Sequence, residues 1–297
     1  MKVLLVSKRT LIYVLIAIGA ILIALAVAVF TGNDEDAAED VKEGSMPARD
    51  QSSRTSDVET SAVMGANSSG IGEYELEVFS GLMKELPVYS VARNDKCIAL
   101  TIDAAWADDK TAFILETLDK YNVKATFFLC GFWVNEHPEM VKSIADAGHE
   151  IGNHSMTHPH MNRLTSSQIA DELRSFEEAL SKITGKKASL FRAPYGEYND
   201  NVIRTIRENG YEVIQWNIDT IDWKKERSAQ TILDTVLTKL NDGAIILCHN
   251  NGYKIEQYLP TLIESALAAG YRFVTVSELL LAGNTVIDVN GVQKPLD

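Results

Sequence analysis

The sequence predicts an α/β protein built as a distorted barrel of (β/α)7 type, preceded by one transmembrane helix and a flexible linker. Between residues 97 and 276, short apolar runs typical of strands alternate regularly with helical patterns. This alternation is typical of strand–helix units with mostly parallel strands. Six or seven such units are present, which favours a barrel somewhat smaller than the eight-stranded one. An open doubly wound sheet is the alternative.

Residues 11–30 are uncharged and consist almost entirely of Leu, Ile, Val and Ala. A helix of this length crosses the hydrocarbon core of a bilayer. Positive residues precede the run and acidic residues follow it, so we expect a cytoplasmic stub at 1–10 and an extracytoplasmic remainder. A cleaved signal peptide with an Ala-x-Ala site at 26–28 is the competing interpretation. We favour a single-pass anchor in the cell membrane, because the run exceeds the usual signal-peptide core of about 7–15 residues.

The segment 31–85 shows no apolar periodicity and is rich in acidic residues, Ser, Gly and Ala. Such a composition buries too little apolar surface to offset the entropy of ordering, so we expect a flexible acidic linker. The catalytic domain is expected over 86–282, and residues 283–297 are expected to form a loose tail.

The net charge of −13 argues against nucleic acid as a partner, because phosphate contacts require clustered Lys and Arg. The three cysteines, Cys97, Cys130 and Cys248, show no C-x-x-C spacing. Buried free thiols are the default interpretation, and one disulfide among them remains open.

The strands and helices of the domain are read from periodicity and from end signals. Thr165 and Gln168 form a capping box that opens a long helix, and Gly148, Gly210 and Gly270 close others. A first edge strand is expected at 87–91, followed by strands at 97–103, 124–130, 150–153, 189–192, 212–219, 244–249 and 273–276. Helices are expected at 108–121, 138–147, 165–183, 199–208, 229–240 and 259–269.

Polar side chains occur at the ends of several predicted strands. In 97–103, alternation places small residues and a final Asp103 on one face. In 212–219 it places three polar residues on one face, Gln215, Asn217 and Asp219. Arg192 and His249 end two further strands. Polar groups in buried strands are costly unless they serve a site, and in α/β folds that site lies at the carboxyl ends of the strands.

Four of the six histidines fall within residues 149–160. His154 and His158 are four residues apart and reach one cation if the segment forms a helical turn or a tight loop, with Zn–N distances of about 2.0–2.1 Å. The alternative is two surface histidines of a polar loop. The clustering favours a metal site.

Five motifs follow in order: Thr101-Ile-Asp103-Ala104, His154-Ser-Met-Thr-His158, Arg192-Ala-Pro-Tyr195-Gly, Asp219-Thr-Ile-Asp222-Trp223 and Leu247-Cys-His249. Over about residues 96–280 this series resembles the polysaccharide deacetylases of the NodB homology domain, carbohydrate esterase family 4. The family patterns are T-F-D-D, H-S/T-x-x-H, R-x-P-Y/F-G, D-x-x-D-W and L-x-H. The variant Asp103-Ala-Ala-Trp106, with the anchor and linker, resembles the PdaB-like sporulation subgroup.

The resemblance implies a metal-dependent hydrolase that removes N-acetyl groups from a cell-wall amino-sugar polymer, peptidoglycan or chitin-like. It implies a divalent metal, zinc or alternatively cobalt or nickel, bound by His154 and His158. Asp103 would be the general base and His249 the general acid, a role that suits an imidazole with an ordinary pKa of about 6.5. Arg192 would orient Asp103, and Asp222 would orient His249. The implied substrate-binding residues are Tyr195, Trp223, Leu247, Asp219 and Trp106.

Ala104 departs from the family pattern, because it stands where an aspartate completes the metal triad. A methyl group cannot bind a metal, so three alternatives are open. The metal is held more weakly by two histidines and waters; Asp103, Asp108 or Asp109 supplies the third bond; or the protein is a weak or inactive deacetylase-fold protein acting in wall binding or sporulation. We expect Asp108 and Asp109 to cap the next helix instead. We therefore expect reduced metal affinity and low or narrowly specific deacetylase activity. The sequence does not distinguish GlcNAc from MurNAc as the sugar and does not give the oligomeric state.

Overall fold

The computed structural model describes residues 85–296, all within the compact unit Ser69–Asp297. The transmembrane helix expected at 11–30 lies outside the described residues. The linker expected at 31–85 does too, except for Glu85, whose Oε2 accepts a hydrogen bond from Arg207 Nη1 at 2.6 Å. Among the helices of residues 85–296, none is long and apolar enough to cross a membrane.

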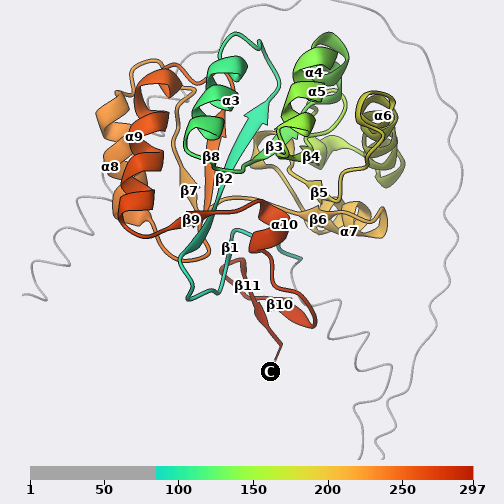
Figure 1. Cartoon of the computed structure of the whole chain (residues 1–297). Coiled ribbons are helices and arrows are strands. Elements are labelled where there is room, and N and C mark those ends of the chain that lie inside the picture. The colour runs from blue at the N-terminus through green and yellow to red at the C-terminus, as the bar shows by residue number, and fades with distance from the viewer. Residues whose placement is uncertain (1–84, 297) are drawn as a thin grey trace, which may run out of the picture. The chain divides into compact units, whose positions relative to one another are not determined.

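A parallel sheet forms the centre of the domain (Figure 1). Its strands lie in the order β6-β5-β4-β3-β2-β8-β7, β9 also pairs with β2, and every ladder in it is parallel. The strands are β2 Cys97–Ala104, β3 Thr126–Leu129, β4 Glu150–Asn153, β5 Leu190–Phe191, β6 Glu212–Val213, β7 Ile218–Asp219, β8 Ile245–His249 and β9 Arg272–Phe273. The predicted α/β class with parallel strands is confirmed.

The helices follow the strands in the predicted alternation. They are α3 Thr111–Lys120, α4 Gly131–Glu136, α5 Pro138–Asp146, α6 Ser166–Thr184, α7 Asp200–Glu208, α8 Ala229–Lys239, α9 Ile255–Ala268 and α10 Val276–Leu279, with short 3-10 turns at Met161–Arg163 and Pro194–Gly196. The capping box of α6 is confirmed, since Thr165 Oγ1 accepts from the Gln168 amide and the Gln168 side chain returns to the Thr165 amide. The short helix α4 was not predicted, because its Gly-Phe-Trp-Val start carries no capping signal.

Strand β2 divides the core in two, as its alternation predicts. Ile98, Leu100 and Ile102 pack in the large apolar cluster with side chains of the helices α3, α5, α6, α8 and α9. Burial of each such side chain contributes about 1.5–3 kcal/mol to folding. The other face of β2 carries Thr101 and Asp103, which contact Arg192 inside the curl of the sheet. The helix-covered face therefore stabilises the strand that presents Asp103.

In place of the distorted (β/α)7-type barrel that the sequence predicts, the parallel sheet is a curled half-barrel. Within the described residues, β6 and β7 are its two edges. The expected strand at 212–219 is split, because the chain leaves one edge after β6 and rejoins the sheet at the other edge as β7. The break ends the predicted alternation. Asn217 is consequently exposed and its Oδ1 accepts from the Ile245 amide, away from the other strand-end polar groups.

The segment expected to be a loose tail, 283–297, is instead ordered through residue 296. β10 Thr285–Ile287 and β11 Val292–Pro295 form an antiparallel pair, and β11 lies parallel to β1 Ser90–Val91 (Figure 1). Asp288 explains the hairpin, because its Oδ1 accepts the amides of Asn290 and Val292 at 2.9 and 3.0 Å. A turn of this kind, closed by an Asp side chain, is a strong local signal.

Candidate active site

The histidine segment forms a tight loop after β4. Two of its residues, Ser155 and His158, have positive φ angles of 67° and 57°. Side chains hold this unusual backbone: Asn153 Oδ1 accepts the Ser155 amide at 2.7 Å, and Ser155 Oγ accepts the His158 amide at 3.0 Å. Glu172 of α6 accepts two further loop amides at 2.8 Å. The loop is therefore fixed by its own sequence and by α6, and the tight-loop alternative is the correct one.

Both imidazoles of this loop keep a nitrogen available. His154 Nδ1 lies 2.8 Å from the carbonyl oxygen of Arg192, and since a carbonyl only accepts, Nδ1 carries the proton and Nε2 is free. His158 Nδ1 is buried and has no hydrogen-bond partner in the described structure. Burial lowers the pKa of His154 and, together with the neighbouring His154, lowers the pKa of His158 to about 4. Both rings are thus neutral at pH 7, the form that binds metals.

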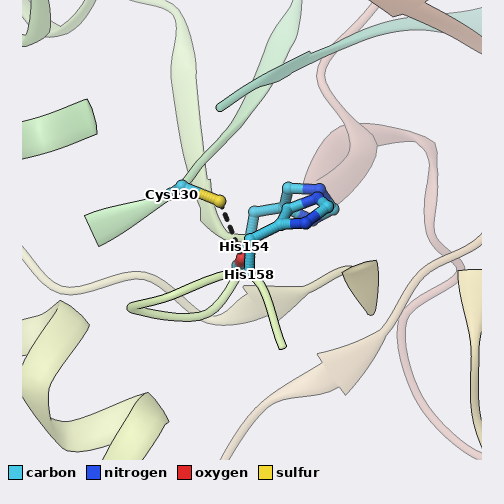
Figure 2. Close-up of side chains that lie close together, drawn as sticks. All are labelled: Cys130, His154 and His158. Carbon is cyan, nitrogen blue, oxygen red and sulfur yellow. Dashed lines mark hydrogen bonds between the residues drawn. The ribbon is translucent and has the colours of Figure 1, made fainter. Parts of the chain in front are cut away.

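Cys130 lies beside the two histidines (Figure 2). One donor atom from each of Cys130, His154 and His158 lies within 4.8 Å of the other two. The Cys130 thiol is fully buried and donates to the His154 carbonyl oxygen at 3.2 Å, and burial raises its pKa. All three cysteines are free and buried, as the default interpretation expects. Sequence reasoning nevertheless missed that Cys130 directly follows β3, at the same carboxyl edge as the other site residues.

Arg192 is fully buried beneath the site and is paired with Asp103. Its Nη1 donates to Asp103 Oδ1 at 2.7 Å and to Thr101 Oγ1 at 2.8 Å. The guanidinium lies over the ring of Phe128 at 4.1 Å and near that of Trp216 at 5.4 Å. Burial alone would raise the pKa of Asp103, but the charge of Arg192 and the proximity of His154 hold it below its usual value. The Asp103 carboxylate is therefore ionised, and its other oxygen lies 3.7 Å from His154 Nε2.

His249, at the end of β8, is held by Asp222. Its Nδ1 lies 2.7 Å from Asp222 Oδ1, and its backbone amide donates to Oδ2 at 3.1 Å. Asp222 is fully buried and also accepts from the hydroxyl of Tyr258 at 2.6 Å, a contact that sequence reasoning missed. Gly252 packs so closely that a Cβ there would lie 2.2 Å from Asp222 Oδ2. Burial alone would lower the pKa of His249, but the hydrogen bond and charge of Asp222 raise it above its usual value.

A cavity of about 520 Å³ opens over these groups. The predicted residues that line it are Asp103, Trp106, His154, His158, Tyr195, Asp219, Trp223, Leu247 and His249. Arg192 and Asp222 do not line it, but they contact Asp103 and His249, which do. Trp216 and Asn251 also line it and were not predicted. Burial raises the pKa of Asp219, whose Oδ1 accepts the Ile221 amide at 2.7 Å.

The rim of the cavity is aromatic. Trp106, Tyr195 and Trp223 are each more than half exposed. The rings of Trp106 and Tyr195 both meet His158 edge-on, with centroids 4.7 and 4.6 Å from its ring. His160 stacks on Tyr195 at 4.5 Å. His158 is therefore held between two aromatic residues that also face solvent.

The predicted alternatives for the third metal ligand behave differently from one another. Ala104 is fully buried in the helix-side cluster and offers only a methyl group. Asp108 pairs with His137 Nδ1 at 3.2 Å, Asp109 is exposed, and neither lines the cavity. They do not cap α3 either: that helix begins at Thr111, its N-cap residue is Lys110, and it has no side-chain cap. The capping prediction is wrong because the helix starts three residues later than expected.

A family model for polysaccharide deacetylase matches residues 90–214. The uncharacterized protein YlxY of Bacillus subtilis is 38% identical over 65% of this chain and 60% of its own length, so the chain spans less than two thirds of it. The peptidoglycan-N-acetylmuramic acid deacetylase PdaA of Bacillus subtilis is 33% identical over 63% of this chain and 72% of its own.

Among solved structures, the BA3943 protein of Bacillus anthracis, described as a CE4 family pseudoenzyme, is 38% identical with a TM-score of 0.62. The match covers 65% of this chain and 68% of that one. A BA3943 mutant, described as having restored enzymatic activity, matches with the same TM-score at 39% identity, over 65% of this chain and 70% of that one. The chain belongs to the polysaccharide deacetylases of the NodB homology type, carbohydrate esterase family 4.

Proposed function

We propose that this chain is a metal-dependent N-deacetylase of a cell-wall amino-sugar polymer, with peptidoglycan as the first candidate. The observation that carries the proposal is that one cavity holds a carboxylate with a lowered pKa and an imidazole with a raised pKa. Asp103 is held ionised by Arg192, whereas His249 is held toward its charged form by Asp222. A base and an acid whose environments push their pKa values apart are the signature of acid–base catalysis. PdaA, described as a peptidoglycan deacetylase, supports the substrate class.

His154 and His158 fit a divalent metal, because both are neutral and the buried Nδ1 of His158 has no partner in the described structure. Zinc is the first candidate, with cobalt and nickel as alternatives. A metal bound there would polarise the acetyl carbonyl and lower the pKa of a coordinated water.

The chain's own residues then move the protons. Asp103 accepts a proton from the water that attacks the acetyl carbonyl carbon, and Arg192 keeps this carboxylate ionised and in place. His249 Nδ1 is bound to Asp222, so Nε2 is the atom that gives its proton to the departing amine nitrogen. The amide C–N bond breaks, and acetate and a free amino sugar are the products. The backbone N–H of Tyr195 is the proposed donor to the developing oxyanion.

The cavity wall suits a sugar chain. The exposed rings of Trp106, Tyr195 and Trp223 offer apolar faces at its rim, against which the C–H faces of pyranose rings pack. Leu247 provides an apolar contact for the acetyl methyl group, and Asp219 offers an acceptor to a sugar hydroxyl. This mixture of apolar walls with a few directed polar groups is usual for ligand sites.

The proposed setting is the outer face of the cell membrane. Residues 11–30 would anchor the chain, and the acidic linker would give the domain at 86–282 reach into the wall. This arrangement, together with the Asp103-Ala-Ala-Trp106 variant, supports a role in sporulation like that of the PdaB-like subgroup.

A second candidate is a catalytically weak or inactive member that binds the wall. Ala104, in the position of a metal-binding aspartate, favours it, as does the similarity to the BA3943 pseudoenzyme.

Acetate release separates the two candidates. The full chain is incubated with purified peptidoglycan and with chitooligosaccharides, with and without a chelator, and with zinc or cobalt added back. Metal-dependent release that is lost in Asp103→Asn supports the deacetylase. Binding of the polymer without acetate release under any metal condition supports the second candidate.

A further inference from the structure

We propose that the thiolate of Cys130 is the third protein ligand of the metal, in place of the carboxylate that Ala104 lacks. The inference rests on the metal site of the proposed function and deepens it. It assigns a binding role to a residue outside the five motifs, which directly follows β3, the strand paired with β2.

The position of Cys130 follows from the register of the sheet. Leu129 pairs with Ala104 on β2 and with Asn153 on β4. The residues that follow Leu129 and Asn153 therefore lie side by side at the carboxyl edge of the sheet, so Cys130 is the neighbour of His154. The backbone confirms the closeness, since the Cys130 amide donates to the Ala104 carbonyl at 2.9 Å. Positions 104 and 130 are adjacent sources from which one negative ligand can come.

The donor atoms are close enough to share one ion. Those of Cys130, His154 and His158 lie within 4.8 Å of one another (Figure 2). Zn–S and Zn–N bonds of about 2.3 and 2.0–2.1 Å in tetrahedral geometry place such donors about 3.5 Å apart. Side-chain rotation supplies the small remaining approach.

None of the three donors is committed to a strong competing contact. His158 Nδ1 is buried with no hydrogen-bond partner within the part of the chain described, and the hydrogen bond of His154 Nδ1 leaves its Nε2 free. The Cys130 thiol makes one hydrogen bond, to a backbone carbonyl, and a thiol is a weak donor. On binding, the metal takes the place of the thiol proton, which passes to solvent.

The charge and chemistry of the set are those of a catalytic zinc site. Two neutral imidazoles and one thiolate carry a charge of −1, the same as two imidazoles and one carboxylate. Three protein ligands leave a fourth position for water, as catalytic zinc sites require. Because thiolate is a softer ligand than carboxylate, the site should prefer zinc and cobalt to magnesium and manganese.

Cobalt titration of the full chain tests the assignment, because a thiolate bound to Co²⁺ gives a charge-transfer absorption in the near ultraviolet that histidine ligands do not give. We expect this band to grow to one equivalent of cobalt in the wild type. Cys130→Ser should abolish it and weaken cobalt binding about tenfold or more, since even the loss of a group that only supports a metal ligand costs about 10–100-fold. Cys97→Ser is the matched control and should keep the band, because Cys97 is a buried thiol at the opposite end of β2.

A second variant guards against misfolding of the first. Ala104→Asp combined with Cys130→Ser should bind cobalt again without the band, because the carboxylate restores the missing ligand. Circular dichroism establishes that each variant is folded. Any of three results overturns the proposal: the folded wild type binds cobalt without showing the band, the folded wild type binds no cobalt, or Cys130→Ser keeps the band. Acetate release without the band would support the proposed deacetylase activity and contradict the assignment of Cys130 as a ligand. The band without acetate release would support the Cys130 assignment and contradict the proposed activity.

Discussion

Asp222 binds His249 twice, through the imidazole Nδ1 at 2.7 Å and through the backbone amide at 3.1 Å. The carboxylate is fully buried and takes a third hydrogen bond from Tyr258 at 2.6 Å. The two bonds to one residue fix the ring in one rotamer and direct Nε2 toward the cavity that His249 lines. Its negative charge raises the pKa of His249, so the imidazolium persists to a higher pH than that of a free histidine.

The first prediction concerns the pH profile. His249 must be protonated to act as an acid, so activity should be lost as pH rises through its raised pKa. Asp222→Asn removes the charge and lowers that pKa, so the alkaline limb of kcat/KM should move to lower pH. Tyr258→Phe is the control and should move it less, since the charge remains. Profiles of acetate release at matched metal concentration measure both shifts, and an unmoved limb in Asp222→Asn would contradict the role of Asp222.

The second prediction concerns the acid and the base themselves. Asp103→Asn and His249→Ala should each reduce deacetylation by about 10²-fold or more, the usual contribution of a general acid or base. Both variants should stay folded, as judged by circular dichroism, although Asp103→Asn should unfold more easily than the wild type, because it leaves the buried charge of Arg192 uncompensated. Full activity of Asp103→Asn would remove the base assignment.

Loss of Arg192 should act mainly on stability. Arg192→Ala leaves Asp103 as an uncompensated buried charge, which typically costs about 3–5 kcal/mol. Arg192→Lys keeps the charge but loses the planar guanidinium, whose Nη1 donates to Thr101 and Asp103 while Nη2 donates to the Gln215 carbonyl, so a smaller loss is expected. Urea unfolding of the full chain measures the stability loss in both variants. Equal midpoints for wild type and Arg192→Ala would show that the pair contributes nothing to folding.

The strand ends were the part of the site that sequence could predict. Asp103, Arg192 and His249 each follow an apolar run, and the carboxyl ends of parallel strands meet at one edge. Tyr258 lies in the first turn of α9 and looks like an ordinary core aromatic. Nothing local shows that its hydroxyl reaches Asp222, because that contact depends on how the helix packs on the sheet. The sequence does not distinguish Cys130 as a site residue, because its apolar sequence neighbours match those of any buried cysteine.

The errors in the fold prediction have local causes. The run 212–219 has strand propensity throughout, but the chain leaves the sheet after Val213 and re-enters at Ile218. Periodicity cannot detect such a crossing, because the alternation of apolar and polar residues in the sequence continues through the segment that leaves the sheet. The tail contained a readable signal, the Asp288-Val-Asn-Gly291 turn between two short β-prone runs. Its partner, β1, lies at the other end of the domain sequence, so the pairing itself was not predictable.

The topology prediction follows from the charges around residues 11–30. Positive residues precede this run and acidic ones follow it, so everything after Phe30 should be outside the cytoplasm. A reporter that is active only in the cytoplasm, fused after Gly72, should be silent, whereas one that is active only outside should report. The same fusion with residues 1–30 deleted is the control and should reverse both readings. A cytoplasmic signal from the intact fusion would contradict the anchor orientation.

The last prediction concerns Ala104→Asp. Without metal, the new carboxylate would lie in an apolar, fully buried place, and an uncompensated buried charge destabilises a fold by several kcal/mol. With metal, the same carboxylate replaces the Cys130 thiolate as the third protein ligand, which keeps the fourth position for water, and its charge is neutralised. The variant should therefore melt at a lower temperature than the wild type in chelator and gain more from added zinc, because a ligand stabilises the folded state by RT ln(1 + [L]/Kd), which grows as the Kd falls. Acetate release should rise with the tighter binding; the BA3943 mutant with restored activity shows that a similar protein can recover turnover. Ala104→Ser, which is of similar size and uncharged, is the control and should show neither effect. An Ala104→Asp protein with the same zinc-induced shift in Tm and the same rate as the wild type would mean that position 104 does not face the metal.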